Sequence, residues 1–334
     1  MPKPAAPTLA RVSLSNSGTF GRIALIASLG WLTGWAQGGF DLEKVRARAE
    51  QADSDAQNAL GNAYNEGRAG LKQDYTEALK WYRRAAERGF AQAQYNLGLA
   101  HELGHGVPAD EREAFKLYLQ AAEQGFGPAQ YNVGNMYATG RGIGQDLFEA
   151  NLWFKQAAEK GIVEAQFNLG LAYEAGRGVK KDETQAARWY KQAADRGFSR
   201  AQYNLGLLLE DGRGVPKNEA AAAGYYRAAA EQGFAAAQNN YGLMWVEGRG
   251  GLAKDPAQAW VWLSLAAENG TNPAARDMVA QGMSTEQRTT AAQLLADRRT
   301  GKVPTPTVAT TPPTAPGKAT PTPRAPELTA VLEE

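Results

Sequence analysis

The sequence has no cysteine and only two histidines, and this limits the chemistry that the chain can carry out. It has 334 residues and no cysteine, which excludes disulfides, thiolate nucleophiles, cysteine-ligated metals and a lipidated cysteine anchor. Its only histidines are His101 and His105, so few side chains are present for imidazole catalysis or zinc binding. Proline is scarce in the body of the chain, because eight of the 16 prolines lie in residues 301–334. A chain rich in glycine but poor in interior proline favours many short helices with glycine-closed ends.

The charge is balanced. The chain has 36 basic and 35 acidic residues, and three of the basic ones lie in an acid-free stretch of the first 36 residues. The remaining body is close to neutral and lacks the positive field that nucleic-acid binding requires. We therefore expect no nucleic-acid partner.

The N-terminus has the pattern of an export signal. Residues 23–35 form an apolar run preceded by Arg22, and small residues Gly34 and Ala36 precede a predicted cleavage site. The run is shorter than the roughly 20 residues of a membrane span. We expect residues 1–36 to be a signal peptide and the mature chain to be periplasmic or secreted, without stable membrane insertion. Retention of residues 23–35 as an inner-membrane anchor is the alternative.

A unit of about 36 residues recurs six times. The string Ala-Gln-Tyr-Asn-Leu-Gly, exact or with one change, occurs at 93–98, 129–134, 165–170 and 201–206. Looser copies of the string occur at both ends of the array. Its glycine recurs first after 37 residues and then every 36 residues: Gly61, Gly98, Gly134, Gly170, Gly206 and Gly242. Such regularity indicates a repeat architecture in which each unit buries its apolar face against its neighbours.

Each unit predicts two helices. In the unit at 163–198, an A helix is expected at about 165–174 and ends where glycines accept the left-handed cap conformation. Asp182 is expected to cap a B helix, with Gln185 three residues later at capping-box spacing. The other units repeat this spacing, and Asn218 with Ala221 is the weakest copy.

These motifs resemble the Sel1-like repeat, a relative of the tetratricopeptide repeat. The matching features are A-x-x-x-L-G-x-x-Y, the G-x-G-V loop, the capping aspartate and A-x-x-W-Y-x-x-A-A-x-x-G. The resemblance implies an all-α, right-handed superhelical α-solenoid of helix-turn-helix repeats. We expect a capping helix within residues 37–55, six repeats over 56–270, closing helices within 271–300 and a disordered Pro/Thr-rich tail at 301–334.

The stretch from His101 to His105 matches the zinc-protease signature H-E-x-x-H. Its register in the repeat argues against a metal site. His101 occupies a position that is tyrosine in other repeats, and Gly104 should already end the helix. The two rings are then not on one helical face, and we expect no metal and no cofactor.

A basic ladder lies in the inter-helix loops. Every unit has one basic residue or histidine between its two loop glycines: Arg68, His105, Arg141, Arg177, Arg213 and Arg249. One hypothesis is that these guanidinium groups grip carboxylates of a partner. The favoured alternative is pairing with acids that end the same A helix. Arg141 has no such adjacent acid.

A stripe along the A helices is the candidate groove. Two columns four residues apart share one helical face, and we expect them to border a concave groove: Tyr95, Tyr131, Phe167 and Tyr203, with Leu99, Asn135, Leu171 and Leu207. Aromatic side chains there could anchor a peptide. The favoured alternative is that they pack against the neighbouring unit. The asparagines of the repeat could bind a ligand backbone or pair between helices.

These features predict an exported, non-enzymatic scaffold that binds a protein or peptide through its groove. No phosphate loop, catalytic triad or paired-carboxylate motif stands out in the sequence. One rival hypothesis is a cell-wall enzyme acting on β-lactams or peptidoglycan, although the Sel1-like proteins linked to β-lactams carry regular cysteine pairs that this chain lacks. The other is a membrane-anchored assembly factor.

Overall fold

The computed structural model describes residues 40–302, so the predicted signal peptide and nearly all of the predicted tail lie outside the described part. Within residues 40–302 all regular structure is helical. The 15 helices are α1 (Leu42–Glu50), α2 (Ser54–Glu66), α3 (Tyr75–Glu87), α4 (Ala91–Leu103), α5 (Glu111–Glu123), α6 (Gly127–Thr139), α7 (Leu147–Glu159), α8 (Val163–Ala175), α9 (Glu183–Asp195), α10 (Ser199–Asp211), α11 (Glu219–Glu231), α12 (Ala235–Glu247), α13 (Pro256–Glu268), α14 (Ala274–Gly282) and α15 (Thr285–Arg299).

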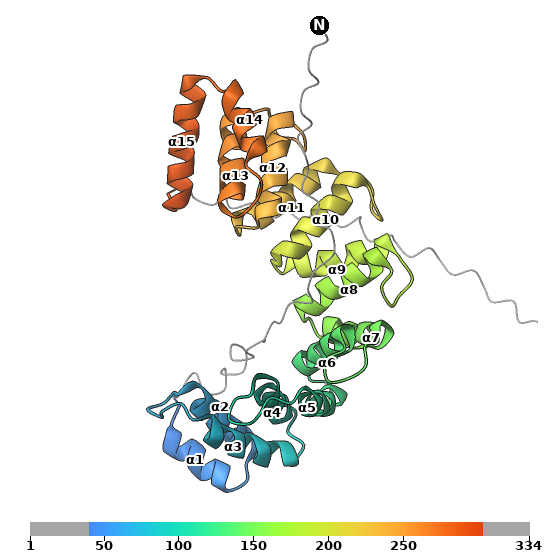
Figure 1. Cartoon of the computed structure of the whole chain (residues 1–334), viewed down its shortest axis with the longest axis vertical. Coiled ribbons are helices and arrows are strands. Elements are labelled where there is room, and N and C mark those ends of the chain that lie inside the picture. Colours follow the sequence, from blue (N-terminus) through green and yellow to red (C-terminus); the bar gives the residue numbers. More distant parts are fainter. Residues whose placement is uncertain (1–39, 303–334) are drawn as a thin grey trace, which may run out of the picture.

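The helices stack in sequence as pairs along a curved path, with α1 and α15 at its two ends (Figure 1). The even-numbered helices α2–α12 are the A helices of repeats 1–6, and the odd-numbered α3–α13 are the B helices. Each A helix packs on its own B helix and on the B helix before it. This confirms the predicted all-α solenoid.

The caps explain where the helices begin and end. The carboxylate of Asp182 accepts a hydrogen bond from the backbone N–H of Gln185 at 2.9 Å and fixes the start of α9. Asn218 caps α11 in the same way, at 2.9 Å from the N–H of Ala221. α8 ends at Gly176, whose φ of +69° is a left-handed cap. α8 begins at Val163, two residues earlier than the sequence predicted.

Glycine allows the two helices of one repeat to approach closely. A Cβ added at Gly98 would lie 2.8 Å from Cε1 of Tyr118, so any side chain there would displace the buried ring. The hydrophobic core continues from repeat to repeat through such contacts. One cluster joins Tyr95 of α4, Tyr118 of α5 and Met136 of α6. Neighbouring repeats therefore share a core, as the solenoid requires.

A second set of contacts joins successive repeats through the loops. Gly142, with φ of +68°, lies so close to the start of α5 that a Cβ would be 2.2 Å from the carbonyl oxygen of Glu111. Only glycine fits both that conformation and that approach. In repeats 2–6 the inter-helix loop thereby rests on the B helix of the preceding repeat.

Different helices close the two ends. α1 packs on α2, and α14 and α15 both pack on α13. α15 begins with a full capping box, in which the Ser284 hydroxyl accepts from the Gln287 N–H and the Gln287 side chain accepts from the Ser284 N–H. The guanidinium of Arg298 lies 4.1 Å from the ring centre of Trp262 and ties α15 to the last repeat. No helix in residues 40–302 combines the length and apolarity that crossing a membrane demands.

Candidate functional site

The aromatic column of the predicted groove lies in the core. The relative exposure is 0% for Tyr95 and Tyr203, 2% for Tyr131 and 9% for Phe167. Each ring packs on an aromatic ring of its own B helix; for Tyr203 this is Tyr226, with ring centres 5.8 Å apart. The anchoring role considered for these rings is therefore corrected. They hold the repeats together, because an A helix packed on both sides has no free face at this position.

The second column lies at the edge of the core, and its leucines pack partly against the core clusters. Leu99, Asn135, Leu171 and Leu207 are half-buried and occur once per repeat on α4, α6, α8 and α10. We call these four residues the A-helix row. Leu103, one helical turn beyond Leu99, is 50% exposed and extends the row at the end of α4. The row is thus a partly apolar strip that runs across successive repeats.

Two asparagines of the repeat pair between neighbouring A helices. The Asn96 amide donates to Oδ1 of Asn58 at 2.9 Å and of Asn62 at 3.1 Å. Asn168 donates to Oδ1 of Asn135 at 3.5 Å, so one row residue is linked to the next A helix. These contacts agree with pairing between helices rather than with binding of a ligand backbone. The leucines of the A-helix row are then the side chains available to a partner.

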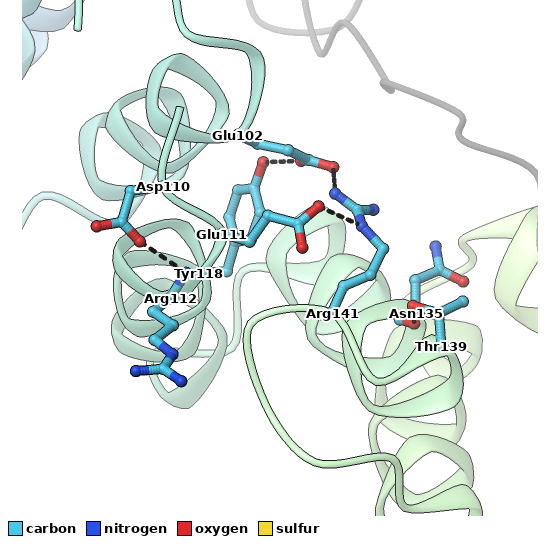
Figure 2. Close-up of polar contacts among 8 residues, drawn as sticks. All are labelled: Glu102, Asp110, Glu111, Arg112, Tyr118, Asn135, Thr139 and Arg141. Atoms are coloured by element: carbon cyan, nitrogen blue, oxygen red, sulfur yellow. Dashed lines mark hydrogen bonds and ion pairs between the residues drawn. The ribbon is translucent and has the colours of Figure 1, made fainter. Parts of the chain in front are cut away.

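The loop arginine of one repeat reaches back to the preceding repeat. Arg141 donates from Nη2 to Oε1 of Glu102 at 2.7 Å and from Nε to Oε1 of Glu111 at 2.8 Å. The Tyr118 hydroxyl donates to the other oxygen of Glu102 at 2.6 Å (Figure 2). We call this tyrosine–glutamate–arginine cluster the polar staple. Arg141 lacks an adjacent acid, but it is held by two acids of repeat 2.

Two further polar staples have the same geometry. In repeats 4 and 5, Tyr190 donates to Glu174 at 2.7 Å, and Arg213 reaches the same carboxylate at 3.1 Å. In repeats 5 and 6, Tyr226 and Arg249 both bind Glu210, at 2.6 and 2.8 Å. The predicted local pairs also form: Arg68 with Glu66, Arg213 with Asp211 and Arg249 with Glu247.

Burial and charge set the pKa values in the staples. Burial raises the pKa of Tyr118 well above its ordinary value, and the neighbouring Glu102 carboxylate raises it further. Partial burial opposes the charge of Arg141, but its bonds to Glu102 and Glu111 prevail and raise its pKa. The Tyr118 hydroxyl therefore stays protonated and the Arg141 guanidinium stays charged. Both groups donate hydrogen bonds to the Glu102 carboxylate, so the staple is satisfied within the chain.

The profile of the Sel1 repeat matches six consecutive segments of the chain: 54–90, 91–126, 127–162, 163–198, 199–234 and 235–271. The chain belongs to the Sel1 repeat family. These segments agree with the repeats of the structure, in which an A helix and a B helix follow each other from α2 to α13.

Solved structures support the same assignment. The chain is 34% identical to c5321, a protective antigen of uropathogenic Escherichia coli with an SLR fold, with a TM-score of 0.69. That match covers 78% of this chain and 58% of the antigen. A Sel1 repeat protein from Oxalobacter formigenes is also 34% identical, with a TM-score of 0.57, and the match covers 67% of this chain and 88% of that one.

A curated relative matches over a short segment. The HRD3A component of an ERAD-associated E3 ubiquitin-protein ligase from Arabidopsis thaliana is 40% identical over 60 residues, which is 18% of this chain and 9% of that protein. The chain thus spans less than a tenth of that relative and somewhat over half of the E. coli antigen.

The two histidines of the Sel1 array do not converge. His101 lies in the last turn of α4, whereas His105 follows the left-handed Gly104 and stacks on Tyr75 with ring centres 4.4 Å apart. In the described range, 40–302, no cluster of three or more histidine, aspartate or glutamate side chains is arranged to hold a metal ion.

A glutamine column escaped the sequence reasoning. In each Sel1 repeat the glutamine of the Ala-Gln pair donates to a carbonyl at the end of the preceding helix; for Gln166 the acceptor is Ala158, at 3.1 Å. The same carbonyl also accepts from the backbone N–H of Gly161 at 2.9 Å, so the glutamine adds a second hydrogen bond at the helix end. The six members are Gln57, Gln94, Gln130, Gln166, Gln202 and Gln238. Their recurrence in all six repeats was the signal that could have found them.

Proposed function

We propose that this Sel1 repeat chain is a non-enzymatic scaffold that binds a protein or peptide partner along the A-helix row. The observation that carries the proposal is the row itself, which presents a half-buried side chain at the same position of four successive repeats. Packed helices lie roughly 10 Å apart, so an extended chain rising about 3.3 Å per residue could contact the row with about every third side chain.

The chemistry of the row favours a partner held by apolar contacts. Leu99, Leu103, Leu171 and Leu207 supply aliphatic surface, whereas the nearby arginines Arg141 and Arg213 are held in polar staples. Arg177 and Arg249 of the basic ladder likewise lie in loops rather than on the row. The partner that fits is therefore an apolar segment and not a strongly acidic one.

The export proposal rests on the sequence of residues 1–36. We propose that the chain works outside the cytoplasm after cleavage near Ala36. N-terminal sequencing of the exported form tests this point, and a start near Gln37 is the expected result. A retained segment 23–35 would favour the anchored assembly factor.

Site-specific photo-crosslinking tests the binding surface. A photoreactive residue at Leu103, at the exposed end of the row, is expected to capture one protein species reproducibly in cells. The same residue at Ala220, which is exposed on the B helix α11, is the matched control and should not capture that species. Equal capture at both sites would contradict the proposal. Turnover of the chromogenic β-lactam nitrocefin by the purified chain would favour the cell-wall enzyme.

A further inference from the structure

Repeat 3 carries an apolar patch that its neighbours lack. Phe148 and Leu152, one turn apart on α7, are 60% and 42% exposed, and Ile143 in the loop before α7 is 37% exposed. We call these three residues the repeat-3 patch. They account for three of the four large hydrophobic residues that are markedly exposed in residues 40–302. The patch is on a B helix and does not involve the A-helix row.

The equivalent positions of other repeats are polar or small. Where repeat 3 has Phe148 and Leu152, the other repeats up to the fifth have Thr76 and Lys80, Arg112 and Lys116, Thr184 and Arg188, or Ala220 and Gly224. The fold therefore does not need large apolar side chains there. A cluster of exposed apolar side chains on an otherwise polar face is typical of a contact site.

Three cations lie around the patch, and the acids Asp146 and Glu149 lie beside it at the start of α7. Arg112 and Arg188 occupy the equivalent column on the B helices on either side, and Lys155 lies one turn after Leu152. All three are exposed, and none forms an ion pair with another residue of the described range. The Arg112 side chain points away from the nearby polar staple (Figure 2). An apolar centre with a cationic rim is complementary to an apolar segment flanked by carboxylates.

The chain itself contains such a segment. Residues 327–334 read Glu-Leu-Thr-Ala-Val-Leu-Glu-Glu, with Leu328, Val331 and Leu332 at the i, i+3, i+4 spacing of one helical face. Three glutamates and no basic residue accompany them. We propose that residues 327–334 dock on the repeat-3 patch of the same chain, with the three aliphatic side chains on Phe148 and Leu152 and the glutamates facing the cationic rim.

The intervening chain is long enough for this contact. The 24 residues between Lys302 and Glu327 span up to about 80 Å when extended. From α15 to α7 there are four helix-to-helix steps along the B helices, or about 40 Å at a packing distance of roughly 10 Å. A tether of this length keeps the segment at a high effective concentration near the patch, so even a weak contact is populated.

Disulfide trapping in the full chain tests the proposal, because the natural sequence has no cysteine. We expect the pair Leu152→Cys and Val331→Cys to form an intramolecular disulfide about tenfold faster than the pair Gly224→Cys and Val331→Cys. Gly224 is the matched control, because it is the equivalent exposed position on α11 and a side chain there meets open space.

The second arm of the trapping experiment places a negative charge on the repeat-3 patch. Phe148→Asp in the first cysteine pair should slow trapping about tenfold without changing the melting temperature, because the ring is mostly exposed. Ala220→Asp is the control and should leave trapping unchanged. Equal trapping at Leu152 and Gly224, or products that form only between chains, would overturn the proposal.

Anionic vesicles test the alternative that the repeat-3 patch binds a lipid surface and not residues 327–334. Vesicles that contain phosphatidylglycerol are mixed with the full chain and with a chain truncated before Glu327. Binding that needs Phe148 but is indifferent to the truncation would assign the patch to a lipid surface and overturn the tail proposal. The expected result is no binding by the full chain.

Discussion

Repeats 2 and 3 solve the same packing problem in opposite ways. In repeat 2 the B-helix Tyr118 donates to Glu102, and this carboxylate also binds the next loop arginine. In repeat 3 the equivalent residues are Phe154 and Ala138, both almost fully buried. Repeat 2 therefore has both the tyrosine hydroxyl and the carboxylate, and repeat 3 has neither.

Repeats 4, 5 and 6 follow the same pattern, and repeat 1 departs from it. Repeats 4 and 5 have both polar groups, whereas repeat 6 has Leu263 and Val246 at these positions. In repeat 1, Tyr82 has no glutamate at this position and donates instead to Asn62 at 2.8 Å. A buried hydroxyl or carboxylate is costly without its partner. The comparison teaches that the tyrosine hydroxyl is kept only where it has an acceptor, which is the glutamate in repeats 2, 4 and 5 and Asn62 in repeat 1.

The largest expected effect is at the most buried carboxylate. The Glu210 side chain is 8% exposed and binds both Tyr226 and Arg249. We expect Glu210→Ala to lower the free energy of unfolding by about 3 kcal/mol, because two buried bonds lose their acceptor. Urea denaturation followed by circular dichroism measures this.

Glu247→Ala is the matched control, because Glu247 binds the same Arg249 from an exposed position. It should change the free energy of unfolding by less than about 1 kcal/mol. Equal losses in the two variants would contradict the argument from burial.

Alkaline pH should reveal the contribution of the Tyr118 hydroxyl to the stability of repeat 2. Burial and the adjacent carboxylate raise the pKa of Tyr118 above its unfolded value of 10.0. A raised pKa means that the stabilisation is complete below pH 10 and is lost as the pH rises above it. We expect the wild-type chain to lose about 1 kcal/mol more than Tyr118→Phe between pH 10 and 11, because the unfolded tyrosine is only about half ionised at pH 10. Denaturation midpoints at pH 8, 10 and 11 measure the difference, and parallel losses would contradict it.

A double-mutant cycle tests whether the staple acts as one unit. Glu102→Ala alone leaves the Tyr118 hydroxyl without its acceptor, whereas adding Tyr118→Phe makes repeat 2 resemble repeat 3. The second change should recover about 1 kcal/mol of unfolding free energy. Additive losses would show that the two groups are independent.

The smallest effect on the free energy of unfolding is expected when repeat 3 is given the glutamate and the tyrosine of the staple. Ala138→Glu or Phe154→Tyr alone should destabilise the chain, because each adds a polar group to a buried site. Together they should cost about 1 kcal/mol less than the sum of the two single changes. The same denaturation experiment measures the coupling, and a sum equal to the single effects would weaken the comparison.

Much of the fold followed from local signals. The glycine spacing predicted the six helix pairs, and Asp182 and Asn218 start helices where the sequence placed them. The A helices begin earlier than predicted because their first turn follows a hydrophobic residue such as Ile162, with no side-chain hydrogen bond at the cap. A start without a polar cap leaves little trace in the sequence.

The candidate site was less predictable. Tyr95 and Leu99 share a helical face in the sequence, but one is buried and the other half-exposed. Their difference depends on how closely the neighbouring B helix approaches, and a single helix does not specify that distance. The ladder was predicted to pair with adjacent acids, whereas its most buried bonds reach back to another repeat.

The sequence by itself determined the period, the helix pairs and their caps, because these depend on residues within a few positions of one another. Only the tertiary structure decided that Arg141 binds Glu102, 39 residues earlier, and that the aromatic column closes the core. Such contacts arise when repeats stack, since stacking brings together side chains that no local rule relates.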